Sequence, residues 1–213
     1  MVEFKYKREV TGIPPGDRRQ RRRIELRERI LEAARELFEE RGYDATKVSE
    51  ICERADVAYG TFFNHFPEKR DVLRQLADLS LRDITEDLEE LAKQPGTIED
   101  QLLALFLGSA ESLADTRPES RDLLERIHAI AYAEAPADRD RRFHSAFETF
   151  LAEGVARGRV RDDLPLETLA EVVASTFASL ALSWVHFDDY PVRERAEAAA
   201  RFLASSLRPR DAI

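Results

Sequence analysis

The sequence has one cysteine, Cys52, so an internal disulfide is excluded, and we expect this thiol on a half-buried helix face. Glycine and proline are scarce, with 8 and 9 residues among 213. No uncharged apolar run reaches the roughly 18 residues that suggest a membrane span, and no signal-peptide pattern is present. These absences favour a cytoplasmic protein without a membrane partner.

Catalytic and metal-binding motifs are also missing. The four histidines show no metal-ligand spacing, and the sequence has no GxSxG, no HExxH and no phosphate-binding glycine loop. We therefore expect no metal, no cofactor and no enzymatic activity.

The composition that is present favours an all-α fold. Charged residues make up 35% of the chain, and Ala, Leu, Glu and Arg dominate. Residues 1–16 end in GIPPG and predict a flexible basic arm. Glycine and proline positions divide the rest into about nine expected helices: from Asp17 to the break at Gly42, 46–54, 58–66, 68–93, 98–115, 118–134, 138–157, 166–188 and 192–207.

Charge is distributed unevenly along the chain. Residues 1–70 carry 16 basic and 14 acidic side chains, whereas residues 71–213 carry 17 and 28. The stretch DRRQRRRIELRER, residues 17–29, contains seven arginines. Arginines at a helix start oppose the helix dipole unless an anion lies nearby. A nucleic-acid phosphate backbone would supply that anion, and a solvated basic tail is the alternative.

Two short helices follow the first long one. Thr46 is the expected N-cap of the helix over 46–54, and Asp56 stands where the chain must reverse within a few residues. In the next helix, Phe62, Phe63 and Phe66 have the spacing to pack it onto the preceding helices. This layout is that of a helix-turn-helix, which we place within residues 17–67.

The remaining positions of the helix over 58–66 suit an outer surface. Its first residues are small or flexible enough to approach base edges, and its later polar side chains can donate to phosphates. A capped structural helix with a polar face explains the spacing equally well. The candidate DNA-binding residues are Thr46, Ala58, Tyr59, Gly60, Thr61, Asn64, His65 and Lys69.

Specific motifs in this region resemble the DNA-binding domain of the TetR family of bacterial transcriptional regulators. The matching segments are ILEAARELFEERGYDAT, V-x-E-I, A-x-V and GTFFNHF-x-x-K. The resemblance implies phosphate contacts from Thr46, Asn64, His65 and Lys69, and base contacts from Tyr59, Gly60 and Thr61. Three positions depart from the family pattern, with Asp56 in place of Gly, Ala58 in place of Ser, and Phe63 in place of Tyr.

Residues 68–213 are expected to form an effector-binding and dimerisation bundle. Family members bind small apolar or amphipathic effectors in this region, and the segment EGVARGRVRDDLPLETLA loosely resembles the family. The aromatic spacing on its own fits a packed core better than a ligand pocket. The candidate pocket residues are Phe106, His128, Tyr132, Phe147, Phe177 and Trp184.

The helix from residue 166 to 187 is apolar on almost every side, so it needs two packing partners. One partner is its own bundle, and the second is the same region of another subunit in a homodimer. A central helix in a monomer is the alternative. The candidate interface residues are Val173, Leu180, Trp184, Ala199 and Leu203.

These inferences lead to one main functional hypothesis. The protein would be a homodimeric transcriptional regulator that acts as a repressor. It would bind a palindromic double-stranded DNA operator and leave it when an effector binds. The long helix over 68–93 would transmit that signal, because it follows the recognition helix and continues into the bundle. The alternative is an all-helical small-molecule carrier or enzyme that retains an unused helix-turn-helix.

Overall fold

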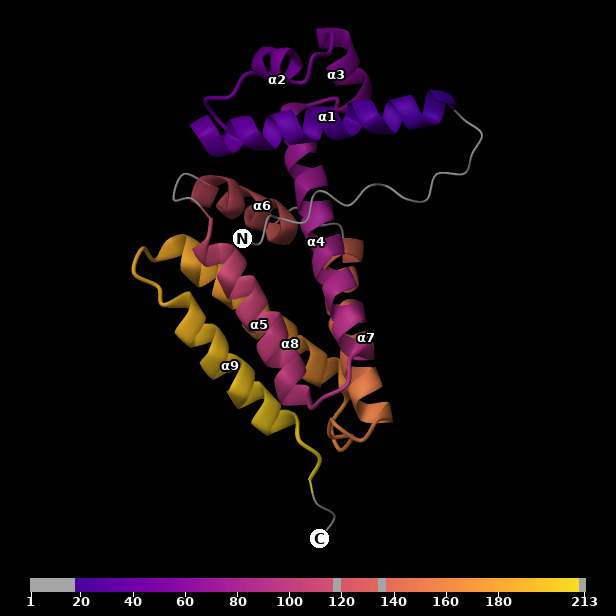
Figure 1. Ribbon diagram of the computed structural model, residues 1–213, viewed down its shortest axis with the longest axis vertical. Coiled ribbons are helices and arrows are strands. Elements are labelled where there is room, and N and C mark those ends of the chain that lie inside the picture. The colour runs from indigo at the N-terminus through magenta and orange to yellow at the C-terminus, as the bar shows by residue number, and fades with distance from the viewer. Residues whose placement is uncertain (1–17, 117–119, 134–136, 211–213) are drawn as a thin grey trace. The chain divides into compact units, whose positions relative to one another are not determined.

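The computed structural model describes the backbone of residues 18–116, 120–133 and 137–210, and the side chains of these ranges except 131–133 and 137–140. In these ranges the regular structure is helical and no strand occurs (Figure 1). The predicted all-α fold is confirmed, and the expected helices are present with bounds shifted by only a few residues. They are α1 (Arg18–Arg41), α2 (Val48–Arg54), α3 (Tyr59–His65), α4 (Lys69–Lys93), α5 (Ile98–Ala114), α6 (Arg121–Ala133), α7 (Ala137–Ala156), α8 (Leu166–His186) and α9 (Val192–Leu207). The predicted arm over 1–16 and the helix start at Asp17 lie outside the described residues.

The chain divides into two compact units. The described residues of the first, which we call the N-terminal unit, are 18–79 and 120–130. Those of the second, the bundle unit, are 80–116 and 131–210 without 134–136. This division differs from the expected boundary after residue 67, because the first turns of α4 and most of α6 cluster with the helix-turn-helix. One helix, α4, therefore belongs to both units.

The core of the N-terminal unit is built on one face of α1. Phe62 and Phe66 are 0% and 1% exposed, so α3 is packed through these two rings as predicted. The same prediction is wrong for Phe63, which is 38% exposed and lies beside Tyr59 with ring centroids 5.0 Å apart. The α1 side chains that are buried are Ile30, Leu31, Ala33, Ala34, Leu37 and Phe38.

The bundle unit is organised around α8. This helix packs along α7 and also contacts α9 and α5, while α5 lies along α9 (Figure 1). In its core the Phe177 ring lies 5.4 Å from Phe106 and 5.6 Å from Phe147, measured between ring centroids. Three helices, α5, α7 and α8, thus meet at one aromatic cluster.

Among the described residues, α8 alone has the length and composition of a membrane-crossing helix. That property is weak evidence, because core helices of soluble proteins share it. The contacts of α8 with three neighbouring helices fit a core helix.

Candidate nucleic-acid interface

The first turn of α3 forms an exposed edge of the N-terminal unit. Ala58, Tyr59 and Gly60 are exposed, and the Tyr59 side chain has 57% of its area open. Apart from its chain neighbours and the backbone of its own helix, nothing in the described residues lies within 4 Å of the place where a side chain on Gly60 would begin. Thr61 is half-buried and Asn64 is exposed. This edge has the small and polar side chains that close approach to base edges requires, and the contacts themselves remain predictions.

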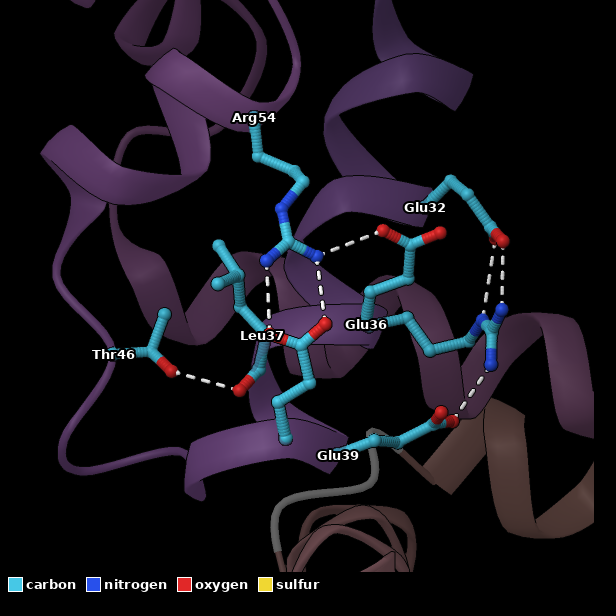
Figure 2. A network of polar contacts seen from close by, with 8 residues as sticks. Glu32, Glu36, Leu37, Glu39, Thr46 and Arg54 are labelled. Atoms are coloured by element: carbon cyan, nitrogen blue, oxygen red, sulfur yellow. Dashed lines mark hydrogen bonds and ion pairs between the residues drawn. The ribbon is translucent and has the colours of Figure 1, made fainter.

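Ion pairs hold α2 against α1. The Arg54 guanidinium donates to the Glu40 carboxylate at 2.9 Å and to Glu36 at 3.0 Å, and Figure 2 shows Arg54 pointing at Glu36. Hydrogen bonding to Glu40 and then to Glu36 raises the pKa of Arg54 above its ordinary value. Such exposed pairs contribute little stability individually, so their main effect here is to fix the orientation of α2.

The turn between α2 and α3 is held in a conformation that side chains rarely adopt. Asp56 has a φ of 49°, in the left-handed region that aspartate tolerates better than most residues. Arg29 of α1 donates to the Ala55 and Asp56 carbonyls, and the second distance is 3.1 Å. A guanidinium from α1 therefore stabilises the turn that sets the angle of α3.

His65 lies at the C-terminal end of α3, beside α1. Its imidazole is half-buried, and its Nδ1 has no hydrogen-bond partner in the described part of the chain. Burial, followed by the positive charges of Arg23 and Arg27, lowers the pKa of His65. The positive charges of Arg23 and Arg27 near His65 make its surroundings electropositive, which suits the predicted phosphate contact.

Lys69 has a structural role that the sequence did not indicate. Its ammonium donates to the carbonyls of Tyr43 at 2.7 Å and Thr46 at 2.8 Å, and it lies 4.1 Å from the centroid of the Tyr43 ring. Burial lowers the pKa of Lys69. Two of its three N–H groups are thus occupied by the α1–α2 loop, so at most one is left for the predicted phosphate contact.

The prediction for Thr46 is wrong in two respects. The N-cap of α2 is Lys47, whose backbone N–H donates to the Glu50 carboxylate at 2.8 Å. The Thr46 side chain is 1% exposed, and its hydroxyl lies 2.8 Å from the Gly42 carbonyl. It also lies 3.2 Å from the Leu37 carbonyl, and Figure 2 draws this second contact. A buried hydroxyl that bonds to the end of α1 is unavailable to a phosphate.

The positioning residues of this interface were missed at the sequence level. Arg27, Arg29 and Arg54 each bond across helices, but in the sequence they look like ordinary charged residues of helical faces. Arg27 donates to the His65 carbonyl at 3.1 Å and lies 4.5 Å from the centroid of the Phe66 ring. The density of arginine in residues 17–29 was a signal for Arg27 and Arg29, but it does not extend to Arg54.

Only some of the predicted effector-pocket residues lie together in the structure. Phe106, Phe147 and Phe177 are in contact, and Trp184 is 5% exposed, so these rings are packed in the core of the bundle unit. His128 falls in the N-terminal unit, so its place beside these rings stays a prediction. The side chain of Tyr132 lies outside the described residues.

Most of the predicted dimer-interface residues point into their own unit. The exposed fractions are 0% for Val173, 4% for Leu180, 5% for Trp184 and 3% for Leu203, which leaves them no surface for a partner, and only Ala199 is half-exposed. The prediction is therefore wrong for the four buried residues. The outward face of α8 and α9 instead carries Thr168, Val172, Ser175, Ser179, Ala198 and Phe202.

That outward face has two large apolar side chains. Phe202 is 71% exposed and Val172 is 52% exposed, and small or hydroxyl residues surround them. Exposed apolar side chains mark association surfaces when they lie together. Because α8 contacts α9, we take Val172 and Phe202 as candidates for such a surface.

Comparison with known proteins identifies the class of the helix-turn-helix. Residues 30–76, from the second half of α1 through the first turns of α4, match the family model of bacterial regulatory proteins, tetR family. The Fatty acid metabolism regulator protein of Bacillus subtilis (strain 168) is 25% identical over 190 residues, covering 84% of this chain and 93% of that protein. The HTH-type transcriptional repressor KstR of Mycobacterium tuberculosis (strain ATCC 25618 / H37Rv) is 27% identical over 183 residues, covering 84% and 80%.

Solved structures extend the similarity to the bundle. Thermus thermophilus FadR, a TetR-family transcriptional repressor in complex with lauroyl-CoA, has a TM-score of 0.64 and 29% identity over 87% of this chain and 97% of its own. A TetR-family regulator from Pectobacterium atrosepticum shares the fold, with a TM-score of 0.69 and 20% identity over 89% and 96%. The fold and the exposed α3 define a helix-turn-helix DNA-binding protein. Its residues 30–76 match the DNA-binding domain of the TetR family of bacterial transcriptional regulators, and the chain is similar over most of its length to proteins described as transcriptional regulators and repressors.

Proposed function

We propose that the protein is a homodimeric repressor that binds a palindromic operator in the bacterial cytoplasm and leaves it when an amphipathic effector binds. The observation that carries this proposal is the exposed first turn of α3. Its surroundings are held by Arg29 and Arg54, and it lies inside the region that matches the family. In this arrangement α3 is the recognition helix.

A long-chain acyl-CoA is the effector class that we propose. Two observations on relatives support it: the name of the Bacillus subtilis relative refers to fatty acid metabolism, and the Thermus thermophilus structure contains lauroyl-CoA. In this chain, the contacting rings of Phe106, Phe147 and Phe177 form an apolar cluster, which an acyl tail entering between α5, α7 and α8 would contact. A charged head group would have to remain near water or basic side chains.

Signal transmission is assigned to α4. This helix begins four residues after α3 ends, and the boundary between the two units falls within it, after residue 79. An effector that shifts its later turns, near Leu81, Ile84 and Leu88, would change the separation of the two recognition helices. That separation must stay near one DNA turn, about 34 Å, for both half-sites to be bound.

A two-fold dimer through the outward face of α8 and α9 completes the proposal. A two-fold axis places the same patch of each subunit against its copy, and pairs two recognition helices with two half-sites. The exposed Val172 and Phe202 support this face as the contact.

The experiment begins with a gel shift against duplex DNA from the neighbourhood of the protein's own coding region. Lauroyl-CoA and stearoyl-CoA are then titrated into the complex, with CoA and lauric acid as controls. We expect the acyl-CoA to weaken operator binding by about 5- to 150-fold, which corresponds to a coupling of about 1 to 3 kcal/mol. Operator DNA must then weaken acyl-CoA binding by the same factor. Equal acyl-CoA affinity with and without operator would contradict the proposed regulation and favour a carrier.

A further inference from the structure

The first turns of α1 carry an unusual concentration of positive charge. Five of the six residues from Arg18 to Arg23 are arginine, no acidic residue occurs in the first turn of the helix, and all five arginines are exposed. The match to the family begins at residue 30, so residues 18–29 precede it. At about 1.5 Å per residue, this stretch is about 18 Å of helix that the matched domain does not include.

These turns continue directly from the proposed DNA interface. Arg27 donates to the carbonyl of His65, the last residue of α3, and the charge of Arg23 acts on the His65 imidazole. Arg29 bonds to the turn that precedes α3. The α1 helix therefore passes along α3, and its first turns extend beyond the end of α3 (Figure 1).

Helical periodicity places the arginines of residues 18–29 on different sides of α1. Arg19, Arg23 and Arg27 are four residues apart, so they form a stripe on the side of α1 where Arg27 contacts α3. Arg21 is two residues from Arg23, which is about 200° around the helix, so it points to the opposite side. Arg18 and Arg22 lie on the side of Arg29, which bonds to the turn before α3. We call the set on the side of Arg27, which bonds to α3 itself, the arginine stripe.

Electrostatics indicate what the stripe binds. Arginines at a helix N-terminus are disfavoured by the helix dipole by a few tenths of a kcal/mol to about 1 kcal/mol each, and their mutual repulsion adds to this. An anionic partner with regularly spaced charges removes both penalties. The DNA backbone is such a partner, and arginine can bind its phosphates in a bidentate manner.

We propose that the arginine stripe binds DNA phosphates adjacent to the segment read by α3, and so extends the footprint of the protein by a sequence-independent contact. The proposal rests on the DNA binding proposed above. The proposed contact is additional to those of the helix-turn-helix, because the residues of the arginine stripe precede the matched region, which begins at residue 30.

The test uses the full chain and a 40-base-pair duplex of random sequence, so that no operator is needed. Dissociation constants are measured at several salt concentrations for the wild type, Arg23→Gln, Arg23→Lys and Arg21→Gln. Each phosphate contact contributes about 0.9 to the slope of log affinity against log salt. We expect Arg23→Gln to lower this slope by nearly that amount and to weaken binding severalfold. Arg23→Lys should retain most of the slope, because lysine also neutralises a phosphate.

The matched control is Arg21→Gln, which removes the same charge from the other side of the same turn. It should leave the slope close to that of the wild type. Equal slopes for Arg21→Gln and Arg23→Gln would overturn the proposal, because the arginines would then act only through overall charge. A wild type that binds no DNA at low salt would instead overturn the proposed function itself. Circular dichroism of each variant checks that α1 remains folded.

Discussion

Arg126 of α6 donates from Nη2 to the Asp44 carboxylate at 2.6 Å, across 82 residues of sequence. Its Nε also bonds to Asp122 of the same helix at 3.1 Å, and its guanidinium lies 5.3 Å from the centroid of the Tyr43 ring. The α1–α2 loop, which also receives the Lys69 ammonium, is thus held from α6 as well as from α4. Hydrogen bonding to Asp122 is the main reason that the pKa of Arg126 is raised.

The first prediction concerns this contact. Arg126→Gln should lower the free energy of unfolding by less than about 1 kcal/mol, because Asp44 is well exposed and such pairs are weak. Amides of residues 42–47 should nevertheless exchange hydrogen faster, because the loop loses its anchor. Hydrogen-exchange mass spectrometry measures this, with the exposed Glu125→Gln on the same helix as control. Unchanged exchange in Arg126→Gln would show that α6 does not restrain the loop.

Lys69 provides a second prediction. Lys69→Ala removes two charge-assisted hydrogen bonds to loop carbonyls, so it should cost about 1 to 3 kcal/mol of stability. Chemical denaturation measures that cost. If Lys69 also contacts a phosphate, the salt slope of DNA binding should fall by about 0.9 in addition. A loss of stability with an unchanged slope would limit Lys69 to its structural role.

We expect His65 to make DNA binding sensitive to pH. In the free protein, burial and the charges of Arg23 and Arg27 lower the pKa of His65, so the imidazole is neutral at pH 7. A bound phosphate stabilises the charged form and raises this pKa, so binding takes up a proton. We expect the affinity for DNA to rise severalfold as pH falls from about 7.5 towards 5.5, and the His65→Gln variant to lose this dependence. Parallel pH profiles for the two proteins would exclude a phosphate contact from His65.

The same shift predicts the effect of acid on the stability of the free protein. Because the folded-state pKa lies below the unfolded value of about 6.5, the unfolded chain binds more protons between the two values. The contribution of His65 to stability is therefore full above about pH 6.5 and decreases as pH falls through that window. Denaturation of the wild type and His65→Gln between pH 7.5 and about 5 measures this difference.

Assembly is tested at the outward face of α8 and α9. Phe202 is 71% exposed in the single chain, so Phe202→Glu should leave the subunit folded while it places a charge in the proposed interface. Light scattering should then report a monomer at micromolar concentration. Phe187→Glu, at an exposed aromatic residue just beyond the end of α8, is the surface control and should stay dimeric. A Phe202→Glu variant that remains a dimer would place the interface elsewhere.

Substitution by alanine should have opposite effects on stability at two helical glycines, Gly154 and Gly108. A methyl group on Gly154 of α7 would lie 2.6 Å from Val160 Cγ2, whereas one on Gly108 of α5 would meet nothing within 4 Å. Gly154→Ala should therefore cost about 1 to 3 kcal/mol through overpacking. Gly108→Ala should stabilise by about 0.5 to 1 kcal/mol, because alanine is the better helix former. Thermal unfolding distinguishes them, and similar shifts in both variants would refute the close approach at Gly154.

The sequence alone determined the helices and the position of the recognition helix. Helix bounds follow from local signals such as the proline and glycine breaks and the 3.6-residue apolar period. The exposed edge at Tyr59 and Gly60 could also be predicted, because Phe62 and Phe66 fix the opposite face of a very short helix. These properties depend on neighbours within a few positions, which the sequence displays directly.

Tertiary structure alone decided which polar groups are occupied and which apolar face is outward. Lys69 and Thr46 look like surface donors until the α1–α2 loop folds over them, and Arg126 meets Asp44 only because α6 returns to the N-terminal unit. On α8, Val172 and Val173 are chemically identical neighbours, but one is 52% exposed and the other is buried. A helix that is apolar on nearly every side has no periodic signal to indicate which side faces its own core, so packing against α5, α7 and α9 made that choice.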